Sequence, residues 1–359
     1  MRLVQLAATG FRNLEPLALS VPAEGMALLG SNGHGKTNVL EAAYYPVLFR
    51  SLRGAADAEM AGFGGPGFKL ECRYADEGVT HDVAVRYTVS PKRKRITVDG
   101  ADIERLADSV GLWLAVAFIP TDTTLASGPA AGRRLYLDRL LSLADREYLG
   151  ALTRYRAALA QRNAALKQRS SALRAFEPAL IENGAAIVQR RLEWLQETAG
   201  LFADEFRAMG ETAQVAVRYL GRDTLADPGA WPETLAEVRS RDEVRGTTTV
   251  GPHRDDLVLE LNGRPLRTYG STGQLRSAAV ALKLLEWDTL ARWRNTEPAL
   301  LLDDVFAELD TRRQGCLAER LRSLPRAQLL VSAPRHDELP EGLDLALWQV
   351  QTGMVSASG

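Results

Sequence analysis

The sequence predicts an α/β nucleotide-binding fold that is interrupted by a helical insertion. A phosphate-binding loop lies near the N-terminus, and a strand that ends in two carboxylates lies far along the chain, with 266 residues between Lys36 and Asp303. Between them, from about residue 125 to 245, short strands give way to long amphipathic helices. The nucleotide-binding domain is therefore expected to be assembled from two separate halves of the chain.

The phosphate-binding loop is the most specific of these signals. Residues 30–37 read GSNGHGKT, which matches the pattern G-x-x-x-x-G-K-[ST], between an apolar strand at 26–29 and a helix-compatible run at 38–43. Glycines let backbone N–H groups surround phosphate oxygens, and Lys36 adds a positive charge beside the positive end of the helix dipole. The expected nucleotide-binding residues of the loop are Gly30, Ser31, Asn32, Gly33, His34, Gly35, Lys36, Thr37 and Asn38.

The second signal is the acid-ended strand. Residues 298–304 read PALLLDD, as expected of a buried parallel strand whose C-terminal end faces a ligand. Asp303 is expected to bind Mg²⁺ together with Thr37, and Asp304 is expected to face an attacking water. Many apolar strands end in acids, so this assignment depends on the loop described above.

A third element, residues 271–274, opens a helical pattern that continues to about residue 285. Ser271 or Thr272 can act as an N-cap, which is the simpler interpretation. The alternative is a second phosphate-binding helix N-terminus. Its position, 29 residues before the acid-ended strand, is where ABC-type ATPases carry their signature motif, which completes a nucleotide site on another subunit.

Over essentially its whole length the chain resembles the RecF family, recombination mediators of the SMC-like branch of ABC ATPases. The resemblance rests on several segments. These are Gly10-Phe11-Arg12-Asn13, the loop 30–37, Gly251-Pro252-His253-Arg254-Asp255-Asp256, Ser271-Thr272-Gly273-Gln274, Leu302-Asp303-Asp304, Glu308-Leu309-Asp310 and Val331-Ser332-Ala333.

Three features depart from the commoner ABC pattern. The signature lacks its second glycine, Asp304 stands where most of these enzymes have Glu, and Ser332 lies where many have a switch histidine. A shorter acid reaches less far towards water. The hydrolysis rate is therefore open at this point.

The resemblance implies an ABC-type ATPase head split by a coiled-coil-like arm, which binds ATP and Mg²⁺, homodimerises around ATP and clamps DNA. It implies that Arg12 and Asn13 lie near the nucleotide phosphates and that Lys36, Asp304 and Ser332 are catalytic. Thr37 and Asp303 would bind the metal. Ser271, Thr272, Gly273 and Gln274 would act on the opposing subunit. It also implies recombinational repair of replication gaps, with RecO and RecR as partners in loading RecA.

The expected organisation has three parts: residues 1–122 form the first half of the head, 123–245 the helical arm, and 246–359 the second half of the head. In the first part, Asp99-Gly100 predicts a hairpin turn. In the third, residues 298–334 show a strand–helix–strand pattern.

Two apolar stripes predict the structure of the arm. One consists of leucines every seven residues, and the other alternates spacings of four and three. Both are typical of helices packed with coiled-coil geometry, and Glu177-Pro178 between them is expected to mark the turn of an antiparallel hairpin. Such stripes more often form an internal core than a docking surface. The stripes are Leu152, Leu159, Leu166 and Leu173, then Val188, Leu192, Leu195, Ala199, Phe202, Phe206 and Met209.

Contact with DNA must come from local charge, because the formal net charge of the chain is −1. Residues 146–176 carry seven basic residues against one acid, and a second cluster occupies 92–95. The alternative for both is a solvated surface. Neither has the aromatic residues of a single-strand stacking platform, which favours contact with the backbone of duplex DNA. The candidates are Lys92, Arg93, Lys94, Arg95, Arg154, Arg162 and Arg169.

The remaining chemistry-bearing residues show no pattern of a site. Two cysteines, Cys72 and Cys316, are too few for a disulfide framework, and the four histidines lack metal-ligand spacing. No apolar run approaches the length of a membrane span, and the N-terminus enters a strand pattern directly. We expect inert thiols and a cytoplasmic protein that makes no membrane contact.

Two other classes of function remain open. One is the ATPase subunit of a transporter, but there the loop and the signature lie closer together and no helical arm with a basic face is expected. The other is a non-hydrolysing DNA-binding module in which ATP serves only as a dimerisation ligand. The sequence does not separate slow hydrolysis from none.

Overall fold

The computed structural model describes residues 1–325 and 327–358. The chain divides into two compact units, which are described separately. The head unit comprises Met1–Asp122, Ala208–Glu211 and Val280–Gly359. The arm unit comprises Thr123–Arg207 and Thr212–Ala279. These two compact units are distinct from the functional division into two head halves and an arm, which remains a proposal.

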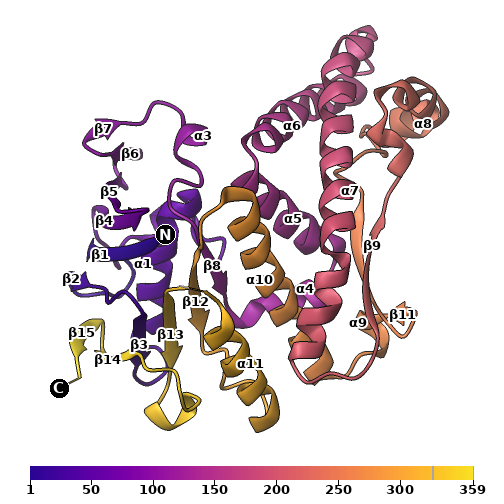
Figure 1. The fold of residues 1–359 in the computed structure, drawn as a ribbon. Coiled ribbons are helices and arrows are strands. Elements are labelled where there is room, and N and C mark those ends of the chain that lie inside the picture. The colour runs from indigo at the N-terminus through magenta and orange to yellow at the C-terminus, as the bar shows by residue number, and fades with distance from the viewer. Residues whose placement is uncertain (326, 359) are drawn as a thin grey trace. The chain divides into compact units, whose positions relative to one another are not determined.

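A six-stranded mixed sheet joins the two ends of the chain within the head unit (Figure 1). Its order is β15-β14-β3-β13-β12-β8, and the pairs from β14 to β8 are all parallel. β3 and β8 precede the insertion and the other strands follow it, so the predicted assembly from two halves is confirmed. The strands are β3 (Gly25–Leu29), β8 (Ala115–Phe118), β12 (Ala299–Asp303), β13 (Leu329–Ala333), β14 (Ala346–Gln351) and β15 (Met354–Ala357).

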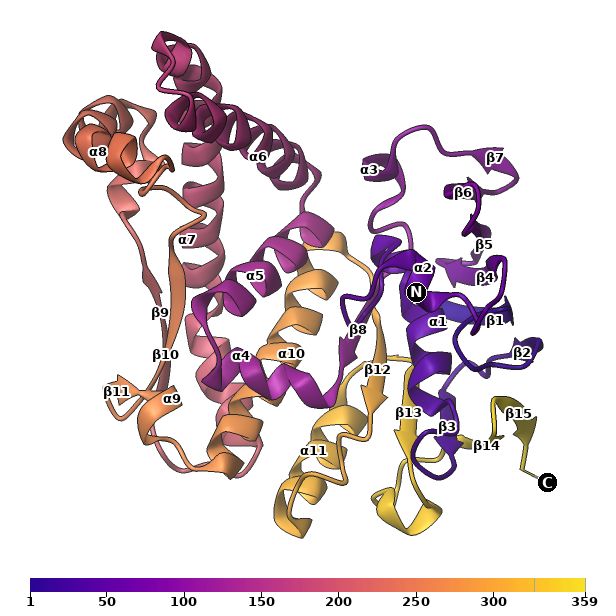
Figure 2. The same ribbon diagram turned by 180° about the vertical axis from the view of Figure 1, so that it is seen from behind.

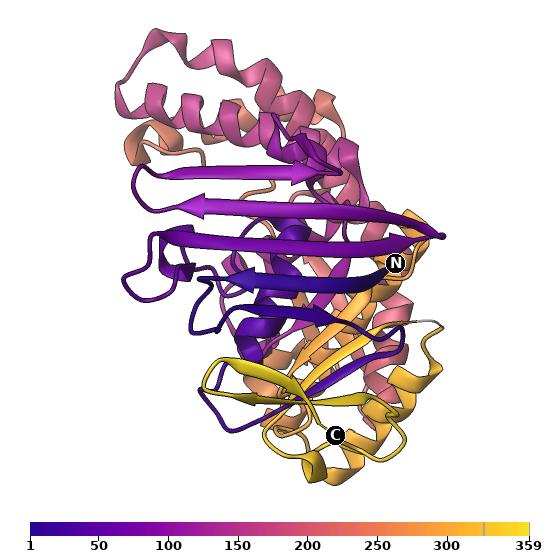
Figure 3. The same cartoon turned by 90° about the vertical axis from the view of Figure 1, so that its left-hand side faces the viewer.

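The second sheet of the head unit is antiparallel, with the order β2-β1-β4-β5-β6-β7, and its long strands lie side by side in Figure 3. The turn between β6 and β7 is the predicted hairpin: Asp99 and Gly100 both have positive φ, 50° and 81°. Such a pair is what a two-residue turn requires. The strands are β1 (Arg2–Thr9), β2 (Leu17–Ser20), β4 (Gly67–Asp76), β5 (Val79–Thr88), β6 (Arg93–Val98) and β7 (Ala101–Asp102).

Helix α1 (Lys36–Leu48) packs against strands of both sheets and is buried along almost its whole length. This explains why its sequence is apolar on every side. Helix α11 (Thr311–Ser323) connects β12 to β13, which confirms the predicted strand–helix–strand unit. The shorter helices of this part are α2 (Asp57–Met60), α3 (Leu106–Ser109), η1 (Pro120–Thr123) and η5 (His336–Glu338).

The arm unit is built on an antiparallel pair of helices, α6 (Arg146–Lys167) and α7 (Glu177–Ala208). Arg154 near the start of α6 donates to Asn183 at 2.8 Å. Tyr148 is nearer the start of α6, and its hydroxyl accepts from Nε of Arg191, further along α7, at 3.1 Å. The two helices therefore run in opposite directions. The predicted turn is displaced, because the connection is η2 (Ser171–Phe176) and Glu177 already begins α7. Pro178 occupies the first turn of a helix, where proline is tolerated.

The buried face of α7 differs from the predicted stripe. Leu192, Leu195 and Ala199 are only half buried, whereas several polar side chains lie in the core. Val188, Phe202, Phe206 and Met209 of the predicted stripe are buried as expected, so only the middle of the inner face is shifted by one position. The buried polar residues of this face are spaced seven residues apart and are Arg191, Thr198 and Glu205.

The arm unit also contains a small sheet, with the order β11-β10-β9 (Figure 2). The stretch from about 125 to 245 is mainly helical as the sequence predicts, but it also contains β9, which the sequence reading did not identify. The strands are β9 (Val215–Leu220), β10 (Asp256–Leu261) and β11 (Arg264–Pro265). The remaining helices are α4 (Thr124–Ser127), α5 (Ala130–Ala144), η3 (Asp223–Ala226), η4 (Pro228–Ala230), α8 (Trp231–Arg245), α9 (Leu266–Tyr269) and α10 (Thr272–Arg294), the last of which continues into the head unit.

Candidate functional site

The phosphate-binding loop connects β3 to α1 as the sequence predicts. Gly30, Gly33 and Gly35 have φ of 156°, 83° and 113°. A Cβ at Gly30 would lie 2.1 Å from the carbonyl oxygen of Val350, so only glycine fits there. A Cβ at Gly33 would meet nothing within 4 Å. The tip of the loop, including Ser31 and Asn32, is exposed, and an incoming phosphate can reach its backbone N–H groups.

Lys36 folds back over this loop. Its Nζ donates to the carbonyl oxygen of Gly30 at 2.7 Å and lies 3.9 Å from a carboxylate oxygen of Asp304. The side chain is only 4% exposed, so little water remains around its charge. A partly desolvated ammonium group attracts an anion more strongly than one in bulk water.

The acid-ended strand lies beside the loop. Thr37 Oγ1 lies 2.8 and 2.9 Å from the two carboxylate oxygens of Asp303, although 266 positions separate these residues. Ser332, at the end of β13, donates its hydroxyl to Asp303 at 2.8 Å. The backbone N–H of Asp304 donates to the Ser332 oxygen at 3.0 Å. The two parallel strands therefore bring their C-terminal residues to one point.

The two aspartates lie in different environments. Asp303 is buried, and this burial raises its pKa, although hydrogen bonds from Ser332 and Thr37 oppose the shift. Asp304 is about a quarter exposed and has a positive φ of 49°. Such a backbone turns its side chain out of the strand direction. The buried acid is thus placed to bind and the exposed acid to meet solvent.

The residues fit a magnesium ion by their chemistry. A carboxylate and a hydroxyl at hydrogen-bonding distance offer the hard oxygen donors that Mg²⁺ takes, and it keeps further positions for phosphate and water. In residues 1–325 and 327–358, no group of three or more His, Cys, Asp and Glu side chains could hold a metal by itself.

The segment after β1 also reaches the loop. Asn13 donates through Nδ2 to the carbonyl oxygen of Gly33 at 3.1 Å, and Asn38 donates to Asn13 at 2.6 Å. Arg12 makes a two-pronged contact with Glu41 at 3.0 and 3.2 Å. The predicted nucleotide-binding residues Arg12, Asn13 and Asn38 therefore lie around the loop.

Sequence reasoning missed Glu41 and Arg53 in this cluster. Arg53 donates to Asn38 at 2.6 Å and pairs with Glu41, whose side chain is fully buried. Burial alone would raise the pKa of Glu41, but hydrogen bonds from Arg53, Arg12 and Ser51 hold it below its ordinary value. The sequence signal that could have identified Glu41 is that it is an acid inside an apolar helical run.

The signature segment forms a cap at the start of α10. The backbone N–H of Ser271 donates to the side chain of Gln274 at 2.9 Å, and the N–H of Gln274 donates to the Ser271 hydroxyl at 3.2 Å. This reciprocal arrangement is a capping box. Ser271 and Thr272 are exposed and Gly273 is half buried, so the helix N-terminus remains open to a ligand.

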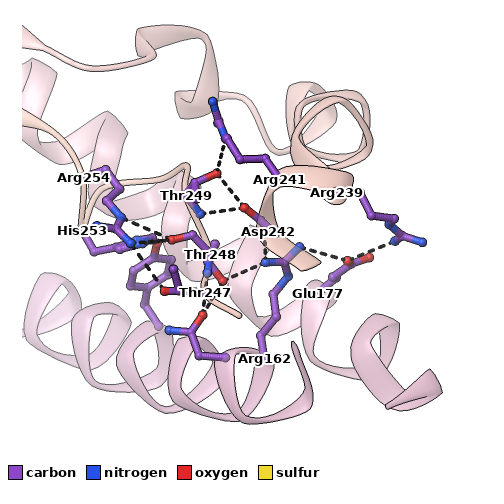
Figure 4. Close-up of polar contacts among 12 residues, drawn as sticks. Arg162, Glu177, Arg239, Arg241, Asp242, Thr247, Thr248, Thr249, His253 and Arg254 are labelled. Carbon is purple, nitrogen blue, oxygen red and sulfur yellow. Dashed lines mark hydrogen bonds and ion pairs between the residues drawn. The ribbon is translucent and has the colours of Figure 1, made fainter. Parts of the chain in front are cut away.

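The DNA candidates fall into three groups. Arg162 was predicted wrongly, because its side chain is 0% exposed and pairs with the equally buried Asp242 at 2.8 Å (Figure 4). Lys94 pairs with Asp57, and Arg95 pairs with Asp102, so both are neutralised within the head unit. The other four candidates are exposed: Lys92, Arg93, Arg154 and Arg169.

His253 belongs to a polar network of the arm unit around Arg162. Its Nε2 lies 3.1 Å from the carbonyl oxygen of Thr248, and its Nδ1 lies 2.7 Å from the hydroxyl of Tyr155. A carbonyl can only accept, so Nε2 carries the proton and Nδ1 accepts from Tyr155. Burial lowers the pKa of His253 to about 4, which keeps the ring neutral at pH 7.

Replacement of His253 by glutamine is expected to change the pH dependence of stability. The ring takes up a proton below pH 6.5 when unfolded but only near pH 4 when folded, so parent stability falls as pH drops through this range. The destabilisation caused by the variant should therefore shrink between pH 7 and pH 4.5, by about 1–3 kcal/mol. Urea unfolding of both proteins at the two pH values measures this difference.

The comparison must be made between parent and variant, because Asp255 acts in the opposite direction. Burial raises its pKa to about 6, so its contribution to stability grows as pH falls through the same range. This term is common to both proteins and cancels in their difference. A destabilisation that stays constant with pH would contradict a neutral buried His253.

The cysteines form no site. Burial raises the pKa of Cys72 to about 12, which leaves it protonated, and Cys316 is partly exposed. Within the described part of the chain, none of the long helices carries the apolar stretch that a bilayer-spanning segment needs.

Comparison with known proteins gives a consistent result. No protein-family model matches the chain. A DNA replication and repair protein RecF from an Anaeromyxobacter species is 37% identical over 99% of both chains. The protein of the same name from Citrifermentans bemidjiense is 32% identical over 99% of this chain and 100% of its own. The one from Salinibacter ruber is 37% identical over 88% of this chain and 81% of its own.

Solved structures agree. A structure of the recombination mediator protein RecF, described as RecF-ATP in the RecFOR pathway, superposes with a TM-score of 0.90 at 27% identity, covering 99% of this chain and 97% of the other. A second structure, described as RecF-ATPrS, superposes with a TM-score of 0.89 at 28% identity, covering 100% of this chain and 98% of the other. An SMC head bound to the winged-helix domain of ScpA gives 0.59 at 13% identity over 100% of this chain and 97% of the other, a likeness of fold alone.

Proposed function

Because the chain belongs to the RecF family of DNA replication and repair proteins, we propose that it is an ATP-dependent DNA clamp in recombinational repair of replication gaps. The ABC ATPase fold of the family is consistent with ATPase activity. The observation that carries the proposal is the meeting of Thr37, Asp303 and Ser332 at the phosphate-binding loop. Family membership removes the transporter alternative.

In the proposed mechanism, each group of the site has one role. The N–H groups of the loop and Lys36 bind the phosphates, with Lys36 exchanging the Gly30 carbonyl for an anionic partner. Arg12 and Asn13 support the loop from the side. Thr37 and Asp303 would hold Mg²⁺, which neutralises charge on the phosphates when bound. Ser332 keeps both aspartates in position, and Asp304 orients the attacking water.

Completion of the site requires a second copy of the chain. The open N-terminus of α10 supports this, because its free N–H groups and dipole favour an anion. We assign Ser271, Thr272, Gly273 and Gln274 to the γ-phosphate bound by the opposing subunit. ATP then holds two subunits together, and hydrolysis releases them. The functional division into head halves 1–122 and 246–359 with an arm at 123–245 belongs to this proposal.

The partners follow from the family. Duplex DNA is the proposed ligand, and RecO and RecR are the proposed protein partners, since related structures are assigned to the RecFOR pathway. Slow turnover is expected because Asp304 is a short acid. DNA is expected to stimulate this turnover by favouring the dimer.

The function is tested by measuring ATP hydrolysis against protein concentration, with and without duplex DNA. The rate per subunit should rise with concentration and rise further with DNA. Lys36→Met and Ser271→Asp should each be inactive, since aspartate preserves the helix cap but repels a phosphate. Their equimolar mixture should recover up to about a quarter of the parent sites, because about half of the dimers are mixed and each mixed dimer has one complete site.

Two results would contradict the proposal. A rate per subunit that does not change with concentration, together with an inactive mixture, would show that no second subunit completes the site. ATP binding without any measurable hydrolysis under all conditions would instead favour the non-hydrolysing DNA-binding module.

A further inference from the structure

A loop of the arm unit, residues 246–254, is held by hydrogen bonds to neighbouring side chains, and Arg241 and Arg254 lie against it (Figure 4). We call it the arm loop. Asp242 of α8 accepts from the Thr249 N–H at 2.9 Å and from its hydroxyl at 2.6 Å. Asn163 of α6 accepts from the Thr248 N–H at 2.7 Å. Two helices therefore determine the path of the loop.

The buried ion pair described above lies beneath this loop. Arg162 Nη1 donates both to Asp242 at 2.8 Å and to the Thr248 hydroxyl at 2.7 Å. On its other side Arg162 faces Glu177 at 3.7 Å, which also contacts Arg239. An ion pair that loses one partner in such a place is costly, so this cluster connects α6, α7, α8 and the loop. Arg162 thus shapes the surface without reaching it.

Four cations lie around the arm loop: Lys167, Arg241, Arg245 and Arg254. Arg241 donates through Nε to the Thr249 hydroxyl at 2.9 Å. Arg254 donates through Nε and Nη2 to the carbonyl oxygen of Thr248 at 3.2 and 3.0 Å. Lys167 packs beside Gly246, where an added Cβ would lie 3.3 Å from its Cγ. We call these four residues the arm-loop surface.

Several arginines of the arm unit are neutralised by acids and carry less charge to offer a ligand. Arg156, Arg190, Arg207, Arg218 and Arg222 each pair with a carboxylate. In the part of the chain that the structure describes, none of the four arm-loop cations has such an ion pair. Glu237 acts on Arg241 electrostatically but is itself paired with Arg222, so the positive charge of the four residues remains available to a ligand.

Two of the four have a structural explanation. Lys167 and Arg245 lie in the last turns of α6 and α8, where a cation stabilises the negative end of a helix. Arg241 and Arg254 have no such role. Arg241 is held to a threonine oxygen by Nε, and Arg254 by Nε and Nη2, which leaves Nη1 of each guanidinium group without a hydrogen-bond partner among the described residues. Side chains fixed in this way lose little entropy on binding.

We propose that the arm-loop surface binds the phosphate backbone of duplex DNA. This inference rests on the proposed function and names the contact surface for it. Planar guanidinium forks match phosphate oxygens, and the surface offers no aromatic platform on which an unpaired base could stack. The contact positions DNA without reading its sequence. Arg241 and Arg254 bind the phosphates, and Arg162 and Asp242 position the loop that carries them.

The test is a salt titration of affinity for a duplex oligonucleotide, with ATP present, for the parent and for Arg241→Gln/Arg254→Gln. The slope of log affinity against log salt should be flatter by about 1.8 for each arm-loop surface that contacts the duplex, since each phosphate contact contributes about 0.9. The loss should be equal for two unrelated sequences. ATP binding should match that of the parent, because both side chains are exposed and lie outside the proposed nucleotide site. The unfolding transition should shift only slightly, by the loss of their hydrogen bonds to Thr248 and Thr249.

Two further variants separate this surface from general charge effects. Arg207→Gln/Arg218→Gln removes the same net charge from arginines of the arm unit that are already paired with acids, and its slope should equal that of the parent. Arg241→Lys/Arg254→Lys keeps the charge and should keep the slope, with a weaker affinity because the fork is lost.

The outcomes distinguish this inference from the proposed function. If the parent binds duplex DNA and the Gln pair leaves the slope unchanged, the inference is overturned, and the phosphate contacts lie elsewhere. An equal slope change in both Gln pairs would show a non-specific charge effect and also overturn it. If Arg241→Gln/Arg254→Gln loses binding to an acidic protein partner but keeps the parent's salt dependence of DNA binding, the surface belongs to that protein and the inference is overturned. A parent that binds no duplex DNA would contradict the proposed function itself.

Discussion

Lys36→Met is expected to weaken ATP binding by a factor of about 10² to 10³, the usual effect of removing a largely desolvated charge from a pair. Methionine keeps the length of the side chain and removes the ammonium group, which is only 4% exposed over the loop. Arginine is a poorer test because it retains the charge. Titration calorimetry with ATP measures the affinity, and ATP-dependent self-association should be lost with it.

A matched control comes from the same unit. Lys69 of β4 is exposed and paired with Glu71 at 2.7 Å, so Lys69→Met removes one lysine charge away from the site. This variant should bind ATP as the parent does. Equal ATP affinity in Lys36→Met and the parent would contradict the assignment of residues 30–37 as a phosphate-binding loop.

Asp304→Asn is expected to slow ATP hydrolysis by a factor of about 10² to 10⁴ while leaving ATP binding intact. Asparagine has the same shape and tolerates the positive φ of 49° at this position, so the backbone should not change. The N–H of residue 304 can still donate to Ser332. What is lost is the negative charge that we propose orients the attacking water. ATP should then accumulate in a stable dimer, which sedimentation detects.

Asp303→Asn provides the contrast within the same pair. Because Asp303 accepts from Thr37 and Ser332, its replacement should weaken the magnesium dependence of ATP binding rather than hydrolysis alone. A monomeric Asp304→Asn protein in ATP and Mg²⁺ would argue against a site shared by two subunits. Identical behaviour of the two variants would argue against separate roles for the two aspartates.

The parts of the site that could be predicted from sequence are those encoded by local patterns. The loop at 30–37 and the acid-ended strand at 298–304 each carry a complete signal over a few residues. Their meeting at Thr37 and Asp303 followed because parallel strands place their C-terminal ends together. Glu41 and Arg53 were missed because neither belongs to a spaced motif, and their role appears only when α1 is packed.

The errors in the arm have a common physical cause. Arg162 was interpreted as an exposed cation because its neighbours in sequence are basic, but its partner Asp242 lies 80 positions away. Strand β9 was missed because it is specified by pairing with β10, which starts at Asp256. Burial of Arg191 on the inner face of α7 depends on a similarly distant partner, because its Nη1 donates to the carbonyl oxygen of Pro252, 61 positions away. Periodicity finds the helix, whereas packing decides which polar residues are inside it.

The order of strands in the mixed sheet has a consequence for how the protein is made. Strand β3, which leads into the phosphate-binding loop, has β13 and β14 as its neighbours, and these begin only at Leu329 and Ala346. A growing chain on the ribosome therefore carries an apolar, unpaired strand until nearly all of it has been synthesised. Pairings between distant segments form slowly, and unpaired strand edges aggregate. The yield of folded protein should therefore depend on chaperones that hold the nascent chain. This yield should fall most when translation pauses before Leu329.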